Sequence, residues 1–214
     1  MPKISPARRD ARRQQILDAA RQCFSEHGFH QAGMAMIVER SGLSHGAVYG
    51  YFSSKDDLIE ALADDRHQRE AILNATAADA RDPLAGLLRL VRAYAEWLND
   101  PSSVTGRRVG VHGWAEALRS QRVKQRVVAG IDAPRRTMIK LIEGAQHTGQ
   151  ICRELRADAL ARSLIALFQG FVLQSVWDEP LEVRECVAVV ERMLKGLGES
   201  EPPAGRRGRR GKAK

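Results

Sequence analysis

The stretch MAMIVERSGLSHGAVYGYFSSK, residues 34–55, constrains this chain most, because it predicts two short helices around a tight turn. Ile37 and Val38 give the first helix an apolar face. Gly42 can adopt the left-handed backbone conformation that ends a helix. Ser44 can cap the next helix by accepting a hydrogen bond from an unpaired backbone N–H group.

The second helix of this pair is expected over residues 45–51, with one buried and one exposed face. Val48 and Phe52 lie four residues apart, so both point inward. Two short helices joined by a glycine turn form a helix-turn-helix, the unit that places a recognition helix in the DNA major groove. The sequence therefore predicts that this helix reads DNA bases.

The surrounding sequence resembles the DNA-binding domain of the TetR family of transcriptional regulators. The similarity covers residues 12–62 and lies in RRQQILDAARQCFSEHGF and in IVERSGLSHGAVYGYFSSKDDLI. Membership would imply an all-α fold, with an N-terminal three-helix DNA-binding domain followed by a helical domain for ligand binding and dimerisation. The rest of the chain matches only in being helical and of suitable length.

The resemblance also assigns roles to single residues. It makes Tyr49 a phosphate contact, Tyr51 a second backbone contact and Lys55 a further backbone contact. Independently of the family, the His45 ring can donate to guanine or accept from an amino group, and Ala47 can contact a thymine methyl group. The expected DNA-binding residues are Ser44, His45, Gly46, Ala47, Tyr49, Tyr51 and Lys55. The alternatives are a surface role for the histidine and core roles for the two tyrosines.

One position departs from the family. Two threonines usually precede the first helix of the motif, whereas this chain has Ala32 and Gly33. A threonine hydroxyl there caps the helix and can contact a phosphate. Losing a capping side chain costs about 1 kcal/mol for alanine and less for glycine. The departure affects one phosphate contact and leaves the fold unchanged.

Charge favours a polyanionic partner and is concentrated at both ends. The chain of 214 residues has a formal net charge of +8 and a pI of about 9.9. Residues 1–11 are expected to be a basic disordered arm, and residues 199–214 a basic disordered tail. Basic side chains of the N-terminal region, which can reach phosphates or the minor groove or remain solvated, are Lys3, Arg8, Arg9, Arg12 and Arg13.

Helical periodicity continues throughout residues 63–198, the expected regulatory and dimerisation domain. After a first helix over about 8–27, and another from Ser54 to about residue 78, helices are expected over 84–99, 104–118, 120–148, 157–177 and 181–197. The 104–118 helix is expected to be short or irregular, and Pro134 is expected to interrupt the 120–148 helix.

The last two helices predict a homodimer. Residues 157–177 are apolar nearly all round and are expected to be buried on more than one side. The helix over 181–197 carries a narrow apolar stripe, typical of a helix seam. A four-helix bundle from two copies accounts for both, and completion of the protomer's own core is the alternative. The expected interface residues are Leu160, Leu164, Phe171, Val183, Val187, Val190 and Leu194.

The resemblance further implies a ligand cavity among the middle helices, and we expect a small apolar effector. Bulky apolar residues are the candidate lining, with ordinary core packing as the alternative. These candidates are Trp97, Trp114, Leu118, Met138, Ile142, Phe168 and Phe171.

No sequence motif indicates an enzyme, a cofactor or a metal site. The chain lacks a phosphate-binding glycine loop, GxSxG and HExxH. The three cysteines are widely separated and form no CxxC pair. Isolated polar residues such as His112, His147, Glu154 and Asp158 are expected on the solvated surface. No membrane span and no secretory signal are expected, so a cytoplasmic location is predicted.

Together these features predict a homodimeric repressor that leaves a palindromic double-stranded DNA operator when a small molecule binds. An activator or a ligand-independent regulator is one alternative. A helical interaction protein that binds nucleic acid without sequence preference is another. Base-specific loss of binding after His45→Ala would separate the last alternative from the others.

Overall fold

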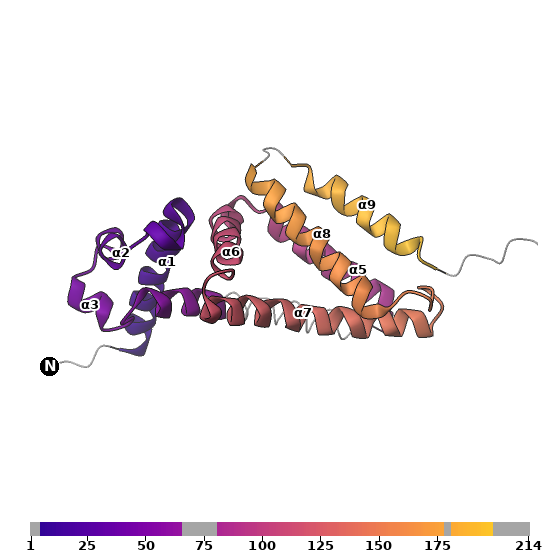
Figure 1. Cartoon of the computed structure of the whole chain (residues 1–214), viewed down its shortest axis with the longest axis horizontal. Helices are drawn as coiled ribbons and strands as arrows, with labels where there is room; N and C mark the ends of the chain where they lie inside the picture. The colour runs from indigo at the N-terminus through magenta and orange to yellow at the C-terminus, as the bar shows by residue number, and fades with distance from the viewer. Residues whose placement is uncertain (1–4, 66–80, 178–180, 199–214) are drawn as a thin grey trace, which may run out of the picture.

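A computed structural model describes residues 5–65, 81–177 and 181–198, and every regular element within these ranges is helical (Figure 1). The predicted all-α fold is confirmed. The elements are α1 (Pro6–Gln31), α2 (Met34–Ser41), α3 (His45–Tyr49), a helix over residues 55–65, α5 (Pro83–Asn99), the short 3-10 helix η1 (Pro101–Ser103), α6 (Val104–Glu116), α7 (Gln121–His147), α8 (Ala157–Trp177) and α9 (Val183–Lys195).

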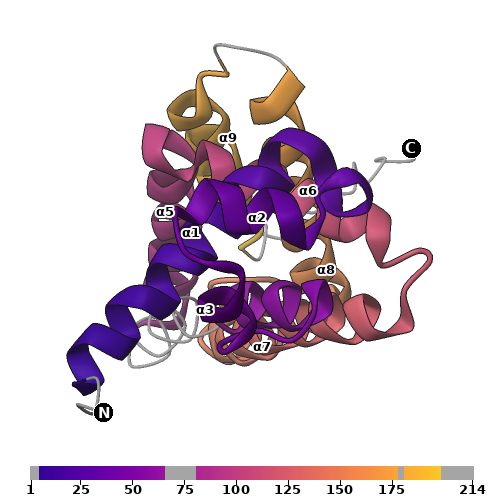
Figure 2. The ribbon, with the colours of Figure 1, turned by 90° about the vertical axis from the view of Figure 1, so that its left-hand side faces the viewer.

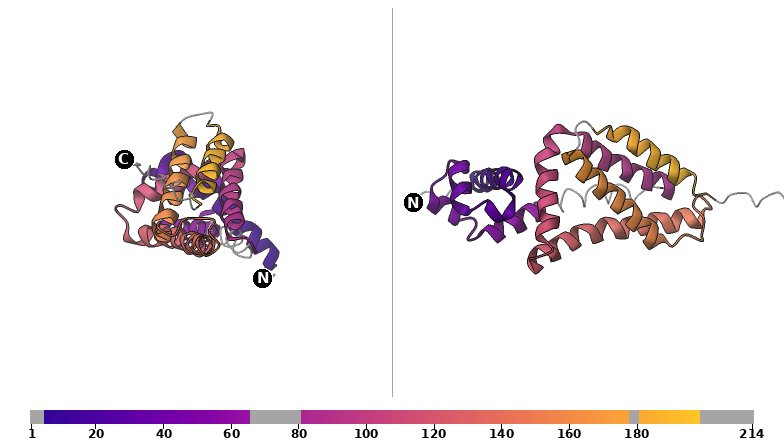
Figure 3. Two further views of the ribbon diagram at one scale, coloured as in Figure 1. Left: turned by 90° about the vertical axis from the view of Figure 1, so that its right-hand side faces the viewer. Right: turned by 45° about the horizontal axis from the view of Figure 1, so that its top comes forward.

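The helices form two lobes. The head contains α1, α2, α3 and the 55–65 helix, and the body contains α5 to α9. In the right-hand view of Figure 3 the head lies at one end, and α7 extends from beside the head along the body. The recognition helix α3 therefore lies at the opposite end of the molecule from α8 and α9 (Figure 1).

The first helix begins earlier than predicted. α1 starts at Pro6, so residues 6–11 are helical and do not belong to a disordered arm. The Ser5 hydroxyl accepts a hydrogen bond from the backbone N–H of Arg8 at 3.4 Å, and proline at the first helical position suits an N-terminus. Residues 1–4 and the tail over 199–214 lie outside the described residues.

The predicted helix-turn-helix is present, but α3 ends at Tyr49 rather than at the expected residue 51. Gly42 ends α2 with φ of 65°, and the Ser44 hydroxyl accepts from the N–H of Ala47 at 3.3 Å. Val48 and Phe52 are both buried. After α3, Asp57 and Ser54 cap each other's backbone N–H groups at 3.1 and 3.2 Å, which starts the 55–65 helix as a capping box.

The head core continues into the body. Its fully buried side chains include Ile16, Leu17, Phe24, Ile37 and Leu58, and Val123 of α7 belongs to the same cluster. Gly28 interrupts α1 with φ of 69°, and Phe29 then packs edge-on against Phe24 at a centroid distance of 4.9 Å. α6 packs against α1, and Phe29 lies next to Gly113 of α6. The head is thus packed directly against α6 and α7.

The body differs from the prediction along α7. This helix runs without a break from Gln121 to His147, although Pro134 lies inside it. Proline removes one backbone hydrogen bond and clashes with the carbonyl group four residues earlier, at a cost of about 3 kcal/mol. Pro134 is buried, and α7 packs against both α5 and α8. This packing keeps the helix continuous.

The apolar stripe of α9, which supplies four of the residues predicted at a dimer interface, is buried within the protomer. Val183, Val187, Val190 and Leu194 are 3%, 8%, 6% and 1% exposed. They pack in clusters shared with α5, and the Arg92 guanidinium of α5 pairs with the Glu191 carboxylate at 2.6 Å. Periodicity correctly identified a buried stripe, but the partner is a helix of the same chain. These four side chains therefore expose little apolar surface of their own.

α8 is less buried than its composition predicts. Only Ala161, Leu164, Val172 and Ser175 of its 21 residues are buried, so one side rather than several packs against the protomer. By length and composition alone, α8 is apolar enough to cross a membrane, with mean hydropathy 1.4 over a window that is 22% buried. Core helices of water-soluble proteins pass the same test. The partly exposed apolar surface still requires an explanation.

Candidate nucleic-acid interface and ligand cavity

α3 lies on the free end of the head, and viewed from that end it stands in front of α7 (Figure 2). Ser44, His45 and Gly46 are exposed, and the Tyr49 side chain is 38% exposed. The rings of His45 and Tyr49 are stacked, with centroids 4.2 Å apart and an interplanar angle of 22°. These two predicted DNA-binding residues therefore form one exposed surface, with imidazole and phenol groups side by side.

The other predicted contacts are less accessible. Ala47 and Tyr51 are half-buried, and Tyr51 packs against the head core. The Lys55 ammonium group donates a hydrogen bond to the backbone carbonyl of Phe29 at 2.6 Å. Lys55 thus connects the start of the 55–65 helix to the end of α1. A phosphate contact from Lys55 would have to share its ammonium group with this carbonyl.

Basic side chains of α1 extend the surface around α3. Arg8, Arg9 and Arg13 are exposed, and Arg12 is half-buried. The Arg13 guanidinium carbon lies 5.7 Å from the ring centre of Phe52, just after α3, so the basic stretch of α1 adjoins the recognition helix. Such a cluster attracts phosphates whatever the base sequence.

Gly33 occupies the N-cap of α2 with φ of −99° and ψ of 163°, and it provides no side-chain hydrogen bond. The backbone geometry of the cap is therefore retained without a capping hydroxyl. Ala32, at the other departure from the family pattern, is fully buried. Of the two positions, only Gly33 is exposed, so only this one can return a hydroxyl to the surface.

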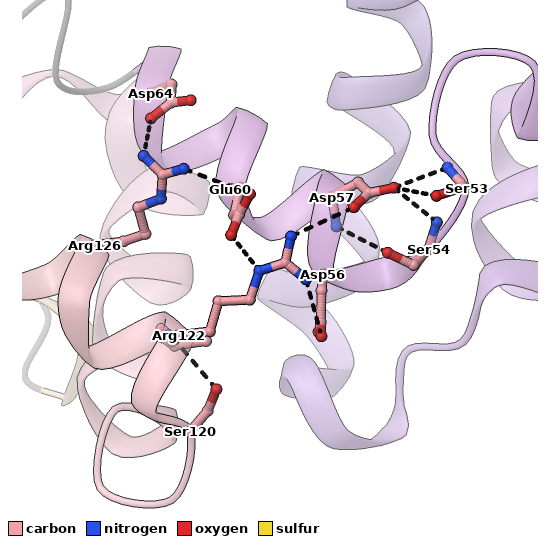
Figure 4. Close-up of polar contacts among 10 residues, drawn as sticks. Ser53, Ser54, Asp56, Asp57, Glu60, Asp64, Ser120, Arg122 and Arg126 are labelled. Carbon is pink, nitrogen blue, oxygen red and sulfur yellow. Dashed lines mark hydrogen bonds and ion pairs between the residues drawn. The ribbon is translucent and has the colours of Figure 1, made fainter.

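Sequence reasoning missed two arginines that join the head to the body. Arg122 and Arg126 of α7 pair with acidic side chains of the 55–65 helix (Figure 4). The Arg122 guanidinium lowers the pKa of Glu60, and hydrogen bonds from Ser53 and Ser54 lower the pKa of Asp57. A signal was present, because acidic residues 56, 60 and 64 and basic residues 122 and 126 share a four-residue spacing.

The body contains a small apolar cavity of about 40 Å³ between α5, α7, α8 and α9. Three of the seven predicted lining residues, Met138, Phe168 and Phe171, do line it. Sequence analysis missed Val91, Tyr94, Ala95, Leu98, Leu164, Leu167, Val187 and Val190. The Tyr94 and Phe168 rings lie 4.7 Å apart. A drug-sized ligand occupies a cleft of about 300–1,000 Å³, so such a ligand would have to widen this cavity.

The remaining predicted lining residues lie elsewhere. Ile142 is fully buried in the core between α5, α7 and α8. Trp97 and Trp114 pack at the edge of the neighbouring cluster, where the Trp97 ring lies 6.0 Å from the Phe168 ring. Leu118 follows α6 in a turn and is 88% exposed, so it lines no cavity. Bulk and apolarity alone did not distinguish core, cavity and surface positions.

The outer sides of α8 and α9 expose apolar side chains. Trp177 is 72%, Val189 60%, Met193 57% and Leu167 38% exposed. A large contiguous apolar patch on a protein surface usually marks a binding site, whereas single exposed apolar side chains are common. Of the residues predicted at a dimer interface, Leu160 and Phe171 are half-buried and Leu164 is buried. We refer to Leu167, Trp177, Val189 and Met193 as the α8–α9 surface.

An exposed recognition helix on a small helical head, joined to a larger helical body, defines a DNA-binding regulator of the helix-turn-helix class. The sequence comparisons identify the family. Residues 16–62 match the family described as bacterial regulatory proteins, tetR family, and residues 83–199 match the family of BetI-type transcriptional repressors, C-terminal. The chain belongs to the TetR family, whose members are transcriptional regulators and not enzymes.

Individual relatives agree with this assignment. The chain is 40% identical over 130 residues to the HTH-type transcriptional repressor Rv1474c of Mycobacterium tuberculosis, covering 54% of this chain and 63% of that one. It is 28% identical over 208 residues to the HTH-type transcriptional regulator BetI of Yersinia pestis, covering 91% and 96%. Among solved structures, GusR of Salmonella enterica superposes with a TM-score of 0.70 at 25% identity, covering 92% and 98%.

Proposed function

We propose that the protein is a homodimeric repressor that acts in the cytoplasm, binds a palindromic operator and leaves it when a small apolar molecule binds. The exposed α3, with His45 and Tyr49 side by side at the free end of the head, is the main support for this proposal. The names of the M. tuberculosis repressor and of the BetI-type family favour repression over activation.

Dimerisation follows from the α8–α9 surface. A single head offers one short recognition helix, whereas two heads can contact successive major grooves about 34–36 Å apart. Burial of the α8–α9 surface between two copies would remove Trp177, Val189 and Met193 from water. The interface proposed here therefore uses the outer sides of α8 and α9, and not the α9 stripe that packs on α5.

The cavity favours an uncharged effector. Within the described part of the chain, its lining consists of aliphatic and aromatic side chains, and the Tyr94 hydroxyl is the one polar side-chain group among them. A charged ligand would lose its hydration without gaining a partner there. An apolar molecule that widens the cavity would displace α7, which contacts both the cavity and the head. Ligand binding and DNA binding would thus be coupled, typically by about 1–3 kcal/mol.

Selection of bound duplexes from a random pool, using the full chain, tests the central proposal. We expect enrichment of a palindrome whose half-site centres are about 10 base pairs apart or a multiple of that spacing. Retention of all sequences to the same extent would contradict sequence-specific regulation and would favour general nucleic-acid binding. Sedimentation of the free protein would report its oligomeric state independently.

Substitutions on α3 separate affinity from specificity. Tyr49→Ala is expected to weaken binding to operator and random DNA alike, because a phosphate contact does not depend on base identity. His45→Ala is expected to reduce discrimination at one base position by about 5- to 150-fold, the value of a good base contact. Equal losses on operator and random DNA for His45→Ala would remove this residue from base recognition.

Filling the cavity tests the effector. Ala95→Leu adds volume at a lining position, and we expect it to retain operator affinity while losing release by uncharged aromatic compounds. Leu118→Ala is a matched control outside the cavity, where an 88% exposed side chain is shortened. Absence of any compound that changes operator affinity of the unmodified protein would leave a ligand-independent regulator.

A further inference from the structure

Two complementary rows of charge meet where the head joins the body (Figure 4). The 55–65 helix presents Asp56, Glu60 and Asp64 at intervals of four residues, and α7 presents Arg122 and Arg126 at the same interval. Residues four apart lie on one face of a helix, so each row forms a line along its own helix. We call this set, together with Asp57, the charge clamp.

The guanidinium groups of the charge clamp bridge several carboxylates each. Arg122 hydrogen bonds to Glu60 through Nε, and its Nη atoms lie 3.8 Å from the Asp56 carboxylate and 3.6 Å from the Asp57 carboxylate. Arg126 lies 3.4 Å from Glu60 and 3.0 Å from Asp64. Glu60 therefore binds both arginines, and the two helices are joined over two turns rather than at one point.

Both ends of the clamp are fixed by helix caps. Asp57, which Arg122 contacts, accepts hydrogen bonds from the backbone N–H groups of Ser53 and Ser54 at 3.0 and 3.1 Å. This cap immediately follows α3, so Arg122 holds the segment that leads out of the recognition helix. On the other side, the Ser120 hydroxyl accepts from the N–H of Val123 at 3.3 Å and defines the first turn of α7.

Exposure indicates what the clamp can contribute. The side chains of Arg122, Asp56 and Asp64 are 52%, 58% and 52% exposed, and Arg126 is 39% exposed. Ion pairs this exposed add little to folding stability. The packing of α1 against α6 already holds the lobes together. A planar guanidinium fork nevertheless requires a particular direction of approach, so such pairs define orientation more than stability.

α7 connects the clamp to the cavity. Met138, in the cavity wall, follows Arg122 by 16 residues on the same unbroken helix. At 1.5 Å per residue, the two positions are about 24 Å apart along the helix axis. If α7 moved at the cavity, Arg122 and Arg126 would move with it relative to the other helices of the body.

We propose that Arg122 and Arg126 are positioning residues that fix the angle of the head on the body and thereby set the half-site spacing that the dimer accepts. The proposal rests on the proposed function, because spacing is defined only for two heads on one duplex. Neither arginine needs to contact DNA for this role. The charge clamp determines which half-site spacing the dimer binds best, and not only how tightly it binds.

The spacing test uses the full chain and duplexes in which the selected half-sites are moved by one or two base pairs. We expect the unmodified protein to lose about tenfold or more in affinity when the spacing changes, and the Arg122→Gln/Arg126→Gln variant to lose less than about threefold. Arg122→Lys/Arg126→Lys retains both charges and is expected to be intermediate. An unchanged spacing profile in the glutamine variant would overturn the proposal.

Arg119→Gln/Lys124→Gln is the matched control. It removes the same two positive charges from the same stretch of the chain, at exposed positions outside the clamp. General loss of attraction to DNA should lower its affinity at every spacing and leave the spacing profile intact. If the control lost the profile as well, net charge rather than the clamp would be responsible, and the proposal would fail.

Amide hydrogen exchange without DNA tests the clamp separately from the proposed function. We expect exchange over residues 57–65 to accelerate by about two- to fivefold in the glutamine variant, while exchange in α5 and α9 stays unchanged. Unchanged exchange over 57–65 would overturn the clamp even if the operator were found. Accelerated exchange in a protein that binds no operator would refute the proposed function and leave the clamp's structural role supported.

Discussion

The head and the body differ in how completely they bury their large apolar side chains. The head places its large apolar side chains inside, including Leu17, Phe24 and Leu58, and completes its core with Val123 from α7 of the same chain. The body leaves Trp177, Val189 and Met193 more than half exposed. The head core is therefore complete within one protomer, whereas the body keeps large apolar side chains exposed, where we propose that a second copy binds.

This difference assigns separate consequences to substitutions in the two lobes. Changes in the body surface should alter assembly with little effect on folding of the protomer. Changes at the junction between the lobes should alter stability, because α1 there packs on α6. Changes on the exposed side of the head should affect only DNA contacts.

The largest effect is expected from charge on the α8–α9 surface. Val189→Asp/Met193→Asp should convert a dimer into monomers, because two carboxylates per copy would be buried in an apolar interface. Operator affinity should fall by about 100-fold or more through loss of bivalent binding. Analytical ultracentrifugation and operator titration measure the two effects. Leu118→Asp, at an apolar position that is 88% exposed but outside α8 and α9, should remain dimeric.

A smaller effect, on stability, is expected at the junction. Gly28 has φ of 69°, and an added Cβ would lie 3.2 Å from Nδ1 of His112 on α6. Gly28→Ala should therefore lower the free energy of unfolding by about 2 kcal/mol, through backbone strain and displacement of the histidine ring. Gly42→Ala adds strain at φ of 65° but meets no atom within 4 Å, so about 1 kcal/mol is expected. Urea denaturation would compare them, and equal losses would contradict a contribution from the α6 contact.

The charge clamp should make stability depend on pH in the acid range. Arg122 lowers the pKa of Glu60 below its ordinary value of 4.5 in the folded protein. The ionised carboxylate therefore stabilises the folded state above pH 4.5, and this contribution is lost as pH falls through the lowered pKa. The unmodified protein should melt at a higher temperature than Glu60→Gln near neutral pH, and the difference should shrink below that pKa.

The control for the pH experiment is Glu143→Gln, which removes one negative charge at an exposed position of α7. Its melting temperature should stay within a few degrees of the unmodified protein throughout, as expected for a surface substitution. A Glu60→Gln difference that grew on acidification would contradict the ion pair with Arg122.

The smallest effect is expected at the cap of α2. Gly33→Thr restores a hydroxyl where glycine now provides no capping hydrogen bond, and an added Cβ meets no atom within 4 Å. Threonine and glycine are similar caps, so stability should change by only a few tenths of a kcal/mol. If the hydroxyl reaches a phosphate, affinity for all DNA sequences should rise by about two- to fivefold, as for one ordinary hydrogen bond. Electrophoretic mobility shifts on random duplexes would measure the change.

The head could be predicted almost completely from sequence, because short-range interactions determine it. Gly42 and Ser44 act within a few residues of their own positions, and so do the caps formed by Ser54 and Asp57. Two features of the head were not predicted: the start of α1 at Pro6 and the contact of Lys55. The bond of Lys55 to the carbonyl of Phe29 spans 26 residues, and no local pattern indicates that contact.

The body could be predicted only as a set of helices. Their ends are close to the expected positions, since caps and breakers are local, but periodicity does not identify the neighbour that covers an apolar stripe. Val190 and Leu194 pack against α5 helix residues about one hundred positions earlier. The same limit applies to Arg122 and Glu60, which are 62 residues apart in sequence. Matching spacings of opposite charge on two helices would have suggested the pair.

The exposed side of α8 and α9 has a consequence for gene dosage. If two protomers must meet through these helices before an operator can be held, the abundance of competent molecules rises with the square of the chain's concentration whenever most chains are single. Halving the copy number would then cut the dimer concentration about fourfold, and operator occupancy by the same factor while most operators are empty. Repression would then depend steeply on how much of the protein is expressed, even in the absence of a ligand.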